Sequence, residues 1–303
     1  MSTLEEQQNR RFAALDPQLP PIAPPPGRSE PLLAFVGRRR TGGLLSHIVH
    51  RPGSWLGLWE SGEVWDLTPV PGDTGAAGLA ALLDAWRMHL RGRPGVQDSS
   101  CTLTWPSRDA EAAAVLLAHG FAPQTCMAIR PPEPAEAPAT SGVNVRRARE
   151  GDLEPLTDLR LEELRYAALV GPAVLRPGAR ELIATEVKYA LQFGGLMWLA
   201  ESGGVPAGMA SCALVEPLPR TPLAGRLHPG DWGYVGTLSV APGARDGGVG
   251  RALMAAAHGE LVSRGVRGTF LFYHPANPLS PVFWHRQGYR PLWTTWARRP
   301  AWP

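Results

Sequence analysis

Hydrophobic residues follow two different periods in the last third of the chain. Residues 234–240 and 269–273 are apolar and β-branched runs bounded by turn residues, which predicts two strands. Between them, apolar residues recur at helical spacing, and Gly265 suits the position just past a helix end. These apolar positions are Leu253, Ala256, Ala257 and Leu261. The pattern predicts a strand, a sharp turn, a helix and a second strand.

The preceding stretch predicts further elements of the same sheet. Residues 143–147 are typical of a strand, and Asp152 can cap a helix with an apolar face at Leu156, Leu159 and Leu164. Residues 196–200 and 207–215, separated by two glycines, indicate a hairpin. The predicted fold class is α/β (α+β).

The turn Arg245-Asp-Gly-Gly-Val-Gly250 joins the first strand to the helix. Backbone N–H groups at a helix start lack partners within the helix, and glycine lets an anion approach them closely. A dinucleotide fingerprint would need glycine where Leu253 stands, and a nucleotide P-loop would need lysine where Val249 stands. The turn therefore predicts a pyrophosphate site of another class; for the turn alone, an ordinary strand-to-helix connection is the alternative.

Two motifs in this order resemble the GCN5-related N-acetyltransferases, the GNAT superfamily. The first is Arg-x-x-Gly-x-Gly, read at Arg245, Gly248 and Gly250. The second resembles the family pattern Asn-x-x-Ala-x-x-Leu-Tyr-x-x-x-Gly-Phe and is carried by Asn277, Ser280, Phe283, Trp284, Gly288 and Tyr289. The resemblance extends over residues from about 142 to 303, and Trp284 departs from it by replacing the family's tyrosine.

The resemblance implies acetyl-CoA as the cosubstrate. It also implies a mixed, mostly antiparallel sheet whose fourth and fifth strands splay apart, so that the pantetheine arm pairs with the fourth strand. The residues expected to bind the cofactor are Leu238, Ser239, Val240, Arg245, Asp246, Gly247, Gly248, Val249, Gly250, Arg251, Asn277, Phe283 and Trp284.

The implied reaction is acyl transfer to the amine of a small molecule by direct attack in a ternary complex. The Val240 N–H is expected to polarise the thioester carbonyl. An alkylamine has a pKa near ~10, so a base is useful. The candidate bases are Glu216, Tyr234 and His274, each of which also has a purely structural interpretation. Because indole is no practical acid, Ser280 or water would have to replace the family tyrosine.

The first half contains a weaker copy of the pattern. Residues 71–82 align with 242–253 with one deletion, and Asp109 precedes Gly120 by the same distance as Asn277 precedes Gly288. In this copy Asp73, Ala76 and Leu79 replace Arg245, Gly248 and Arg251, which weakens an anion site. We expect two tandem GNAT-like domains, the first degenerate. The predicted organisation is a poorly ordered Pro-rich tail at 1–28, a domain at 29–130, a Pro/Ala-rich linker at 131–142 and the acetyltransferase domain at 143–303.

The composition of the chain is compatible with the predicted fold and domain organisation. The chain has 303 residues and a net charge of +3, and its arginine, alanine, glycine and proline bias is typical of a GC-rich bacterial genome. Three scattered cysteines, Cys101, Cys126 and Cys212, predict buried thiols in a reducing compartment. The sequence has no apolar span, signal segment, basic stripe or paired histidines, so we expect a cytoplasmic monomer or homodimer without metal, membrane or nucleic acid.

Two function classes stay open. The first is an acetyl-CoA-dependent N-acetyltransferase whose tandem layout resembles mycothiol synthase and the two-domain acetyltransferases of antibiotic pathways, with acceptor residues around Glu162, Glu163 and Arg165. The second is a non-catalytic acyl-CoA-binding or scaffold protein, which Trp284 and the degenerate first domain suggest.

Overall fold

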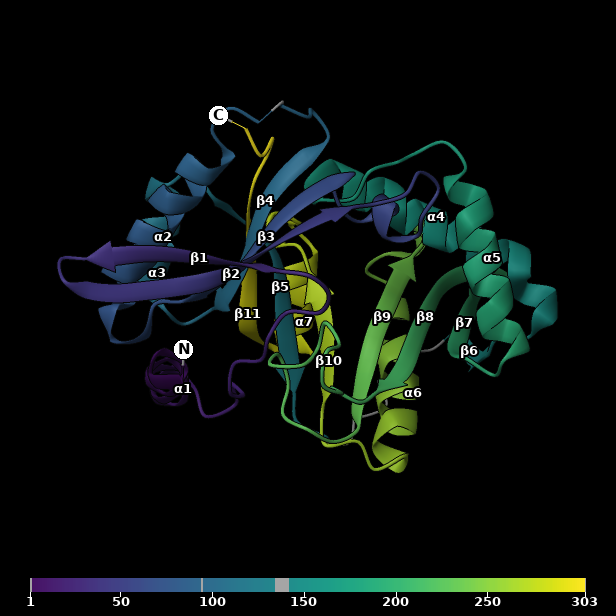
Figure 1. Cartoon of the computed structure of the whole chain (residues 1–303). Helices are drawn as coiled ribbons and strands as arrows, with labels where there is room; N and C mark the ends of the chain where they lie inside the picture. The colour runs from purple at the N-terminus through teal and green to yellow at the C-terminus, as the bar shows by residue number, and fades with distance from the viewer. Residues whose placement is uncertain (1, 94, 134–141, 303) are drawn as a thin grey trace.

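Two halves of the described chain carry related series of strands and helices (Figure 1). The structure is a computed structural model that describes residues 2–93, 95–133 and 142–302. The first half contains α1 (Ser2–Leu15), β1 (Glu30–Val36), β2 (Arg39–Val49), η1 (Leu56–Leu58), β3 (Glu63–Val70), η2 (Gly72–Thr74), α2 (Gly75–Leu90), β4 (Ser99–Pro106), α3 (Ala110–Ala118) and β5 (Ala122–Arg130). The second half contains β6 (Val143–Arg147), η3 (Glu150–Asp152), α4 (Leu153–Val170), α5 (Ala179–Gln192), β7 (Leu196–Ser202), β8 (Val205–Val215), β9 (Trp232–Val240), η4 (Pro242–Ala244), α6 (Val249–Ser263), β10 (Thr269–Tyr273), α7 (Ser280–Arg286) and β11 (Arg290–Arg298).

All of these strands belong to one sheet. Their order is β1-β2-β3-β4-β11-β5-β10-β9-β8-β7-β6. Neighbouring strands are antiparallel except for the pairs β3–β4 and β9–β10. The expected fold class, a mixed and mostly antiparallel sheet flanked by helices, is confirmed.

The same order of elements occurs in each half. The series β3, η2, α2, β4, α3, β5 corresponds to β9, η4, α6, β10, α7, β11. Asp109 and Asn277 occupy equivalent places: the Asp109 carboxylate accepts from the Ala112 N–H at the start of α3, and the Asn277 amide oxygen accepts from the Leu279 and Ser280 N–H groups at the start of α7. The repeat in the sequence therefore corresponds to a repeat of the fold.

The last strand of each half lies in the other half. Both sheet neighbours of β5, namely β11 and β10, come from the second half. Both neighbours of β11, namely β4 and β5, come from the first half. The two halves are therefore joined by exchanged strands at the centre of the sheet, where the colours of the two halves alternate in Figure 1.

Helices cover both faces of the sheet in the second half. Strand residues that alternate along β7 and β8 pack in opposite directions, because Leu199 and Met209 join a core with α4 and α5, whereas Ala200 and Ala210 join a core with α6. Leu58, a residue of η1 in the first half, is fully buried in the core of α4 and α5. The first half thus contributes directly to packing in the second.

The expectation of a poorly ordered tail over residues 1–28 is wrong, because residues 2–15 form α1. Phe12 on this helix is buried against Trp105 and Trp293. The Asp16 carboxylate, just past the helix, accepts from the Arg290 guanidinium at 2.6 and 3.1 Å. Apolar burial and this ion pair stabilise a segment whose prolines begin only at Pro17.

Most of the predicted linker, residues 134–141, lies outside the described residues. Cys101, Cys126 and Cys212 are free and buried, and burial raises the pKa of the Cys101 thiol to about 11. Among the residues that the structure describes, no helix is long and apolar enough to cross a membrane.

Candidate active site

Strands β9 and β10 separate after three paired residues. Their parallel pairing runs from Gly233 opposite Thr269 to Val235 opposite Leu271. At the next residue, Gly236, a bulge interrupts the pairing of β9 with β8, and such bulges bend a strand and redirect its side chains. The splay expected between the fourth and fifth strands is therefore present, and it opens toward the end of β9.

The backbone of β9 beyond the bulge faces this splay. The Ala241 N–H donates to the Ala207 carbonyl at 2.9 Å, so this pair is hydrogen-bonded and the adjacent pair of Val240 with Gly208 is not. The N–H and C=O groups of Val240, and by alternation those of Leu238, point away from β8. The Ser239 side chain points toward α4 and not into the splay, since its hydroxyl donates to the Leu159 carbonyl on that helix at 2.7 Å.

The glycine turn continues directly from the end of β9. Asp246 and Gly248 have φ angles of 65° and 82°, in the left-handed region where glycine is favoured, and Gly248 caps α6. The first bond of α6 runs from the Ala252 N–H to the Gly248 carbonyl at 3.0 Å, so the N–H groups of residues 248–251 precede the helical ladder. These donors, without Cβ atoms at Gly248 and Gly250, fit an anionic phosphate group.

Two arginines flank the turn, and both are exposed. The Arg245 guanidinium carbon lies 5.3 Å from the ring centre of Tyr166 on α4, which places this cation between the turn and the helix. Arg251 lies in the first turn of α6. Asp246 and Gly247 are exposed between them, and Val249 is buried.

Helix α7 closes the other side of the turn. A Cβ atom at Gly250 would lie 3.3 Å from the Phe283 ring and 3.6 Å from the Val240 side chain, so α6, α7 and the end of β9 meet there. Trp284 is buried and packs edge-on against Tyr289 at 5.4 Å between ring centres. The Asn277 oxygen is used to cap α7, and Ser280 is the first residue of that helix.

The three candidate bases lie in different places. Glu216 is exposed just past β8, eight residues beyond Gly208, the partner of Val240, and is thus about 26 Å along the strand from it. Tyr234 stacks on Phe270 at 5.0 Å, and burial raises the pKa of its phenol. His274 follows β10.

The environment of His274 keeps its imidazole neutral. Burial lowers the pKa of His274. Its Nδ1 lies 3.3 Å from both the Gln124 carbonyl and the Thr125 hydroxyl, both on β5 of the first half. Since a carbonyl only accepts, this contact assigns the proton to Nδ1 and leaves Nε2 as an acceptor.

The equivalent loop of the first half is covered by α1. The Gly72 N–H donates to the Gln8 amide oxygen at 3.1 Å, and the Asp73 N–H donates to the Gln7 amide oxygen at 3.2 Å. Strands β3 and β4 stay paired over five residues, from Glu63 opposite Ser99 to Leu67 opposite Leu103. Two N–H groups of this loop therefore bond to α1. The adjacent strands β3 and β4 also stay paired for longer than β9 and β10 do.

Sequence reasoning missed the contacts of Arg160 on α4. This arginine lies four residues after Leu156 and four before Leu164, so a cation interrupts the apolar face. Its guanidinium donates to the Thr237 hydroxyl on β9 and to the Glu163 carboxylate. A cation on the apolar face of a helix was the sequence feature that could have indicated a role for Arg160. Its partners on β9 and in the first half could not be inferred from residue spacing.

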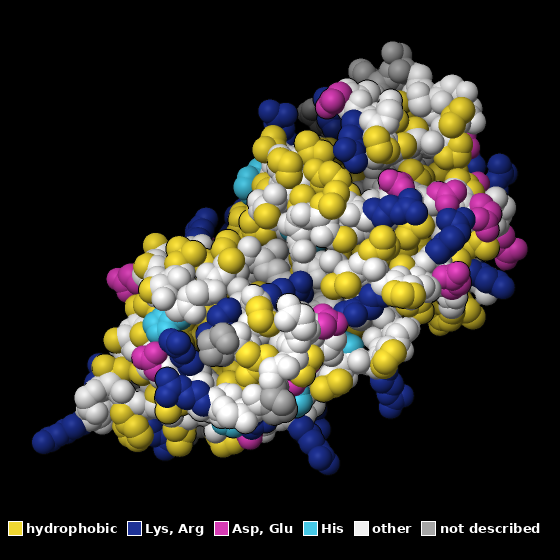
Figure 2. Space-filling view, turned by 90° about the horizontal axis from the view of Figure 1, so that it is seen from above, with side chains coloured by type: hydrophobic (Ala, Val, Ile, Leu, Met, Phe, Trp, Pro, Cys, Tyr) yellow, Lys and Arg dark blue, Asp and Glu magenta, His cyan; other side chains and the backbone are white. Residues whose placement is uncertain are grey.

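Charges on the helical surface are mixed. Arg180 on α5 pairs with Glu154 and Asp158 on α4, and Arg165 pairs with Glu162. Seen from above, basic and acidic side chains lie side by side toward one end of the elongated molecule (Figure 2). Within the described residues, no group of three or more potential metal ligands was found.

Comparison with solved structures shows that the fold is similar to that of a known acetyltransferase. No curated protein matched the chain. A GCN5-related N-acetyltransferase from Sphaerobacter thermophilus is 18% identical with a TM-score of 0.55, covering 86% of this chain and 78% of its own. A tandem GNAT protein from the clavulanic acid biosynthesis pathway is 15% identical with a TM-score of 0.49, covering 98% and 95%. A GCN5-related N-acetyltransferase from Kribbella flavida is 17% identical with a TM-score of 0.49, covering 97% and 96%.

The family model of the acetyltransferase (GNAT) family matches residues 161–289. This range begins within α4, includes the splayed strands and the glycine turn, and ends at Tyr289. The splay, the bulge and the helix start all lie in this range, and residues 161–289 are thus identified as a domain of the acetyltransferase (GNAT) type.

Proposed function

We propose that the second half is an acetyl-CoA-dependent N-acetyltransferase that acts on the amine of a small molecule in a ternary complex. The observation that carries the proposal is that the edge of β9 and the start of α6 form one continuous surface. The free edge of β9 leads directly into a helix start whose first N–H groups have no partner within the described residues, and which two exposed arginines flank. One surface can therefore bind an extended amide-containing arm at one end and its pyrophosphate at the other.

The residues of the chain have separate tasks in this proposal. The N–H groups of residues 248–251, with Arg245 and Arg251, would hold the pyrophosphate. The edge of β9 at Leu238 and Val240 would pair with the pantetheine amides, and the Val240 N–H would stabilise negative charge on the carbonyl oxygen. Bound acetyl-CoA supplies an acyl carbon activated as a thioester.

Departure of the thiol does not require a strong acid. A thiol pKa near ~8.5 allows the sulfur to leave as thiolate. Trp284 can donate an N–H but cannot transfer its proton at neutral pH, and its ring belongs to the core of α6. Ser280 lies one turn earlier on α7 and, with water, would supply the proton.

Isothermal titration with acetyl-CoA tests the cofactor site through two matched variants. Gly250→Asp puts bulk and negative charge where the Cβ would meet Phe283 and Val240, and we expect it to abolish binding. Gly259→Asp is the control, because Gly259 is on the same helix and a Cβ there meets nothing within 4 Å. Retained binding in Gly250→Asp would refute the site assignment.

The second candidate function is a non-catalytic acyl-CoA binder, which the buried Trp284 favours. Both candidates predict binding of acetyl-CoA, so binding does not separate them. Release of free CoA thiol in the presence of an amine does, because only a transferase converts the thioester to a thiol. Binding without thiol release over a broad panel of amines favours the binder.

A further inference from the structure

Arg160 is a buried cation at the point where β9 leaves β10. Its residue exposure is 8%, and a single nitrogen, Nη1, contacts both the Thr237 hydroxyl and the Glu163 carboxylate. Within the described chain, its Nε is buried and has no hydrogen-bond partner. Because Nη1 is shared, the Glu163 carboxylate lies within about 5 Å of the Thr237 hydroxyl.

The bulge at Gly236 brings Thr237, and with it Arg160 and Glu163, to the part of the splay where the acyl transfer would occur. Tyr234 and Thr237 both lie on the α4 side of β9, three residues apart, because Gly236 shifts the alternation by one. Leu238, the next residue, has its N–H in the splay. The Glu163 carboxylate is therefore held beside the stretch of β9 that the cofactor arm would follow.

Two tryptophans of the first half also contact Arg160. The guanidinium carbon lies 5.5 Å from the Trp55 ring centre and 5.0 Å from that of Trp59. These tryptophans flank η1, whose Leu58 is buried in the core of α4 and α5. Cation–π contact and burial thus fix the position of the guanidinium.

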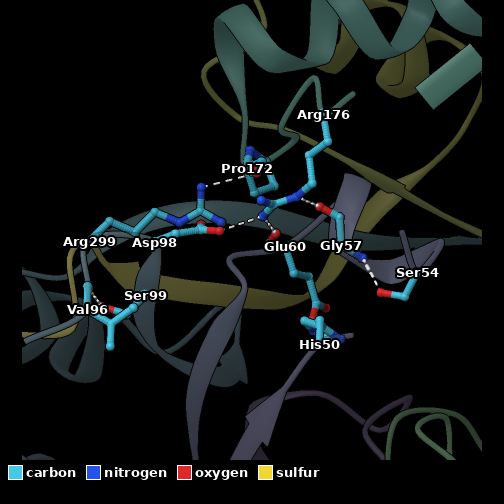
Figure 3. Close-up of polar contacts among 10 residues, drawn as sticks. All are labelled: His50, Ser54, Gly57, Glu60, Val96, Asp98, Ser99, Pro172, Arg176 and Arg299. Carbon is cyan, nitrogen blue, oxygen red and sulfur yellow. Dashed lines mark hydrogen bonds and ion pairs between the residues drawn. The ribbon is translucent and has the colours of Figure 1, made fainter. Parts of the chain in front are cut away.

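Hydrogen bonds clamp η1 against the connection between α4 and α5. Arg176 donates to the Gly57 carbonyl at 2.5 Å and to the Asp98 carboxylate at 2.7 Å, as Figure 3 shows. The Val174 N–H donates to the Leu58 carbonyl at 2.9 Å, and Arg299 donates to the Pro172 carbonyl at 3.1 Å. The tryptophans are therefore carried on a rigid segment.

We propose that Glu163 is the catalytic base that takes a proton from the acceptor ammonium, and that Arg160, held by Trp55 and Trp59, is the residue that positions it. The inference rests on the proposed function. The carboxylate accepts one proton from the ammonium, the freed amine nitrogen forms a bond to the thioester carbon, and the carbon–sulfur bond breaks. The second amine proton is lost as the amide forms, and Ser280 with water passes a proton on to the departing thiolate.

The surroundings of Glu163 suit a base. Burial raises the pKa of its carboxyl, and the adjacent Arg160 opposes this shift only in part. The other titratable groups facing it are Glu186 on α5, which adds to the increase, and the Tyr234 phenol on β9. The side chain retains 26% exposure, so an acceptor can reach it.

The side chains nearby favour an acceptor with an apolar or aromatic body. Tyr234 packs against Phe272 at 6.1 Å between ring centres, and Phe272 is 45% exposed at the end of β10. Trp55 and Trp59, whose ring centres lie 5.5 and 5.0 Å from the Arg160 guanidinium carbon, add further aromatic surface. A suitable probe is therefore 2-phenylethylamine, with thiol release as the readout.

The activity test compares Glu163→Gln with Glu154→Gln in the full chain. Glu154 is the matched control, since it lies on the same helix, is 75% exposed and pairs with Arg180. We expect Glu163→Gln to lower kcat at pH 7 by roughly 10²–10⁴-fold, and this loss to shrink at pH 10, where much of the amine is already neutral. Glu154→Gln should stay within about twofold of the wild type. An equal loss at both pH values, or no loss at pH 7, would overturn the proposal.

A second measurement needs no acceptor. Carbon-13 NMR of glutamate-labelled protein, with the Glu163 resonance identified by its loss in Glu163→Gln, should show a carboxyl that titrates above the ordinary ~4.3. Titration at or below that value contradicts the assignment. If the wild type binds acetyl-CoA and releases no thiol with the probe or with any amine of the broad panel, the proposed function is at fault, whereas the titration still decides the role of Glu163.

The positioning role of Arg160 is tested by Arg160→Lys. Lysine keeps the charge but lacks the planar guanidinium that reaches Thr237, Glu163 and both indoles. We expect kcat to fall about tenfold and the acidic limb of the pH profile to move, with the Kd for acetyl-CoA unchanged. If the acidic limb of the pH profile does not move, Arg160 only supports the fold.

Discussion

His258 on α6 shows how one residue can make the stability of the fold depend on pH. Its Nε2 and the Tyr289 hydroxyl are 2.9 Å apart, and that hydroxyl is 2.9 Å from the Thr269 hydroxyl. The imidazole is 1% exposed, and burial lowers its pKa to about 3, with Arg130 adding to the shift. The folded protein therefore keeps His258 neutral over the whole physiological range.

We expect stability to fall as the pH is lowered through 6.5, the ordinary histidine value. The unfolded chain then gains a proton that the folded chain does not bind until about pH 3. Between pH 8 and pH 5 this single group should cost roughly 2 kcal/mol, measured by urea denaturation.

His258→Gln keeps a polar partner for Tyr289 and should flatten this pH dependence. The control is His285→Gln, because His285 is exposed on α7. If the two variants and the wild type show the same slope between pH 8 and pH 5, burial of His258 is not the cause.

At the scale of residues, local backbone conformation was predictable from the sequence, whereas long-range side-chain contacts were not. The positions of Gly248 and Gly250 follow from backbone needs that act locally, so their spacing is informative. Glu216 lies at the other end of β8 from Gly208, because strand register, which spacing alone does not give, sets its distance. Arg160 was missed since its partners, Trp55 and Trp59, lie about 100 residues away in the sequence.

At the scale of elements, a buried side chain attaches α1 to the first half. Gln8 is fully buried, and its amide oxygen accepts from the Gly72 N–H of η2. Gln8→Ala removes this acceptor and leaves a buried donor unpaired, which we expect to destabilise the protein by about 1–3 kcal/mol. Chemical denaturation of the variant measures the loss.

Gln18→Ala is the matched control, because Gln18 is exposed just beyond α1. It should leave the denaturation midpoint nearly unchanged. Equal midpoints for Gln8→Ala and Gln18→Ala would show that the contact with η2 contributes nothing.

The order of helices and strands was predictable because hydrophobic periodicity is a local property. Residues 234–240 and 269–273 were expected as strands and occur within β9 and as β10. The exchange of β5 and β11 was not predictable, since both strands would satisfy the same pattern in either half. Helix α1 was missed because the prolines that follow it dominated the composition of the tail.

For the whole molecule, the two unequal loops predict one cofactor per chain. The second loop has exposed arginines, whereas the first has two N–H groups bonded to α1 and carries Asp73. Isothermal titration with acetyl-CoA should therefore give a stoichiometry of one. Two equivalents would mean that α1 moves away and that the first loop binds despite its carboxylate.

The exchanged strands predict that neither half folds well alone. In the isolated second half, β11 would lack both of its neighbours, and in the isolated first half β5 would lack both of its own. We expect fragments 1–133 and 142–303 to unfold without a sharp transition when separate, and to recover acetyl-CoA binding when mixed. The full chain, as the control, should unfold in one calorimetric transition.

A sharp transition and full binding by fragment 142–303 alone would contradict this expectation. It would mean that β11 can return to its own half, as in a single-domain arrangement. The exchange would then be a feature of the linked chain and not a requirement of the fold.

The exchange also bears on how the protein emerges from the ribosome. Strand β4 is complete at residue 106, but its partner β11 is made last, at residues 290–298. At 5–20 residues per second, the nascent first half waits roughly ten to forty seconds with the edge of β4 unpaired. An open strand edge invites pairing with other nascent chains, so neighbouring ribosomes on one message could join their products before either is finished. Translation speed over the second half thus becomes a determinant of yield.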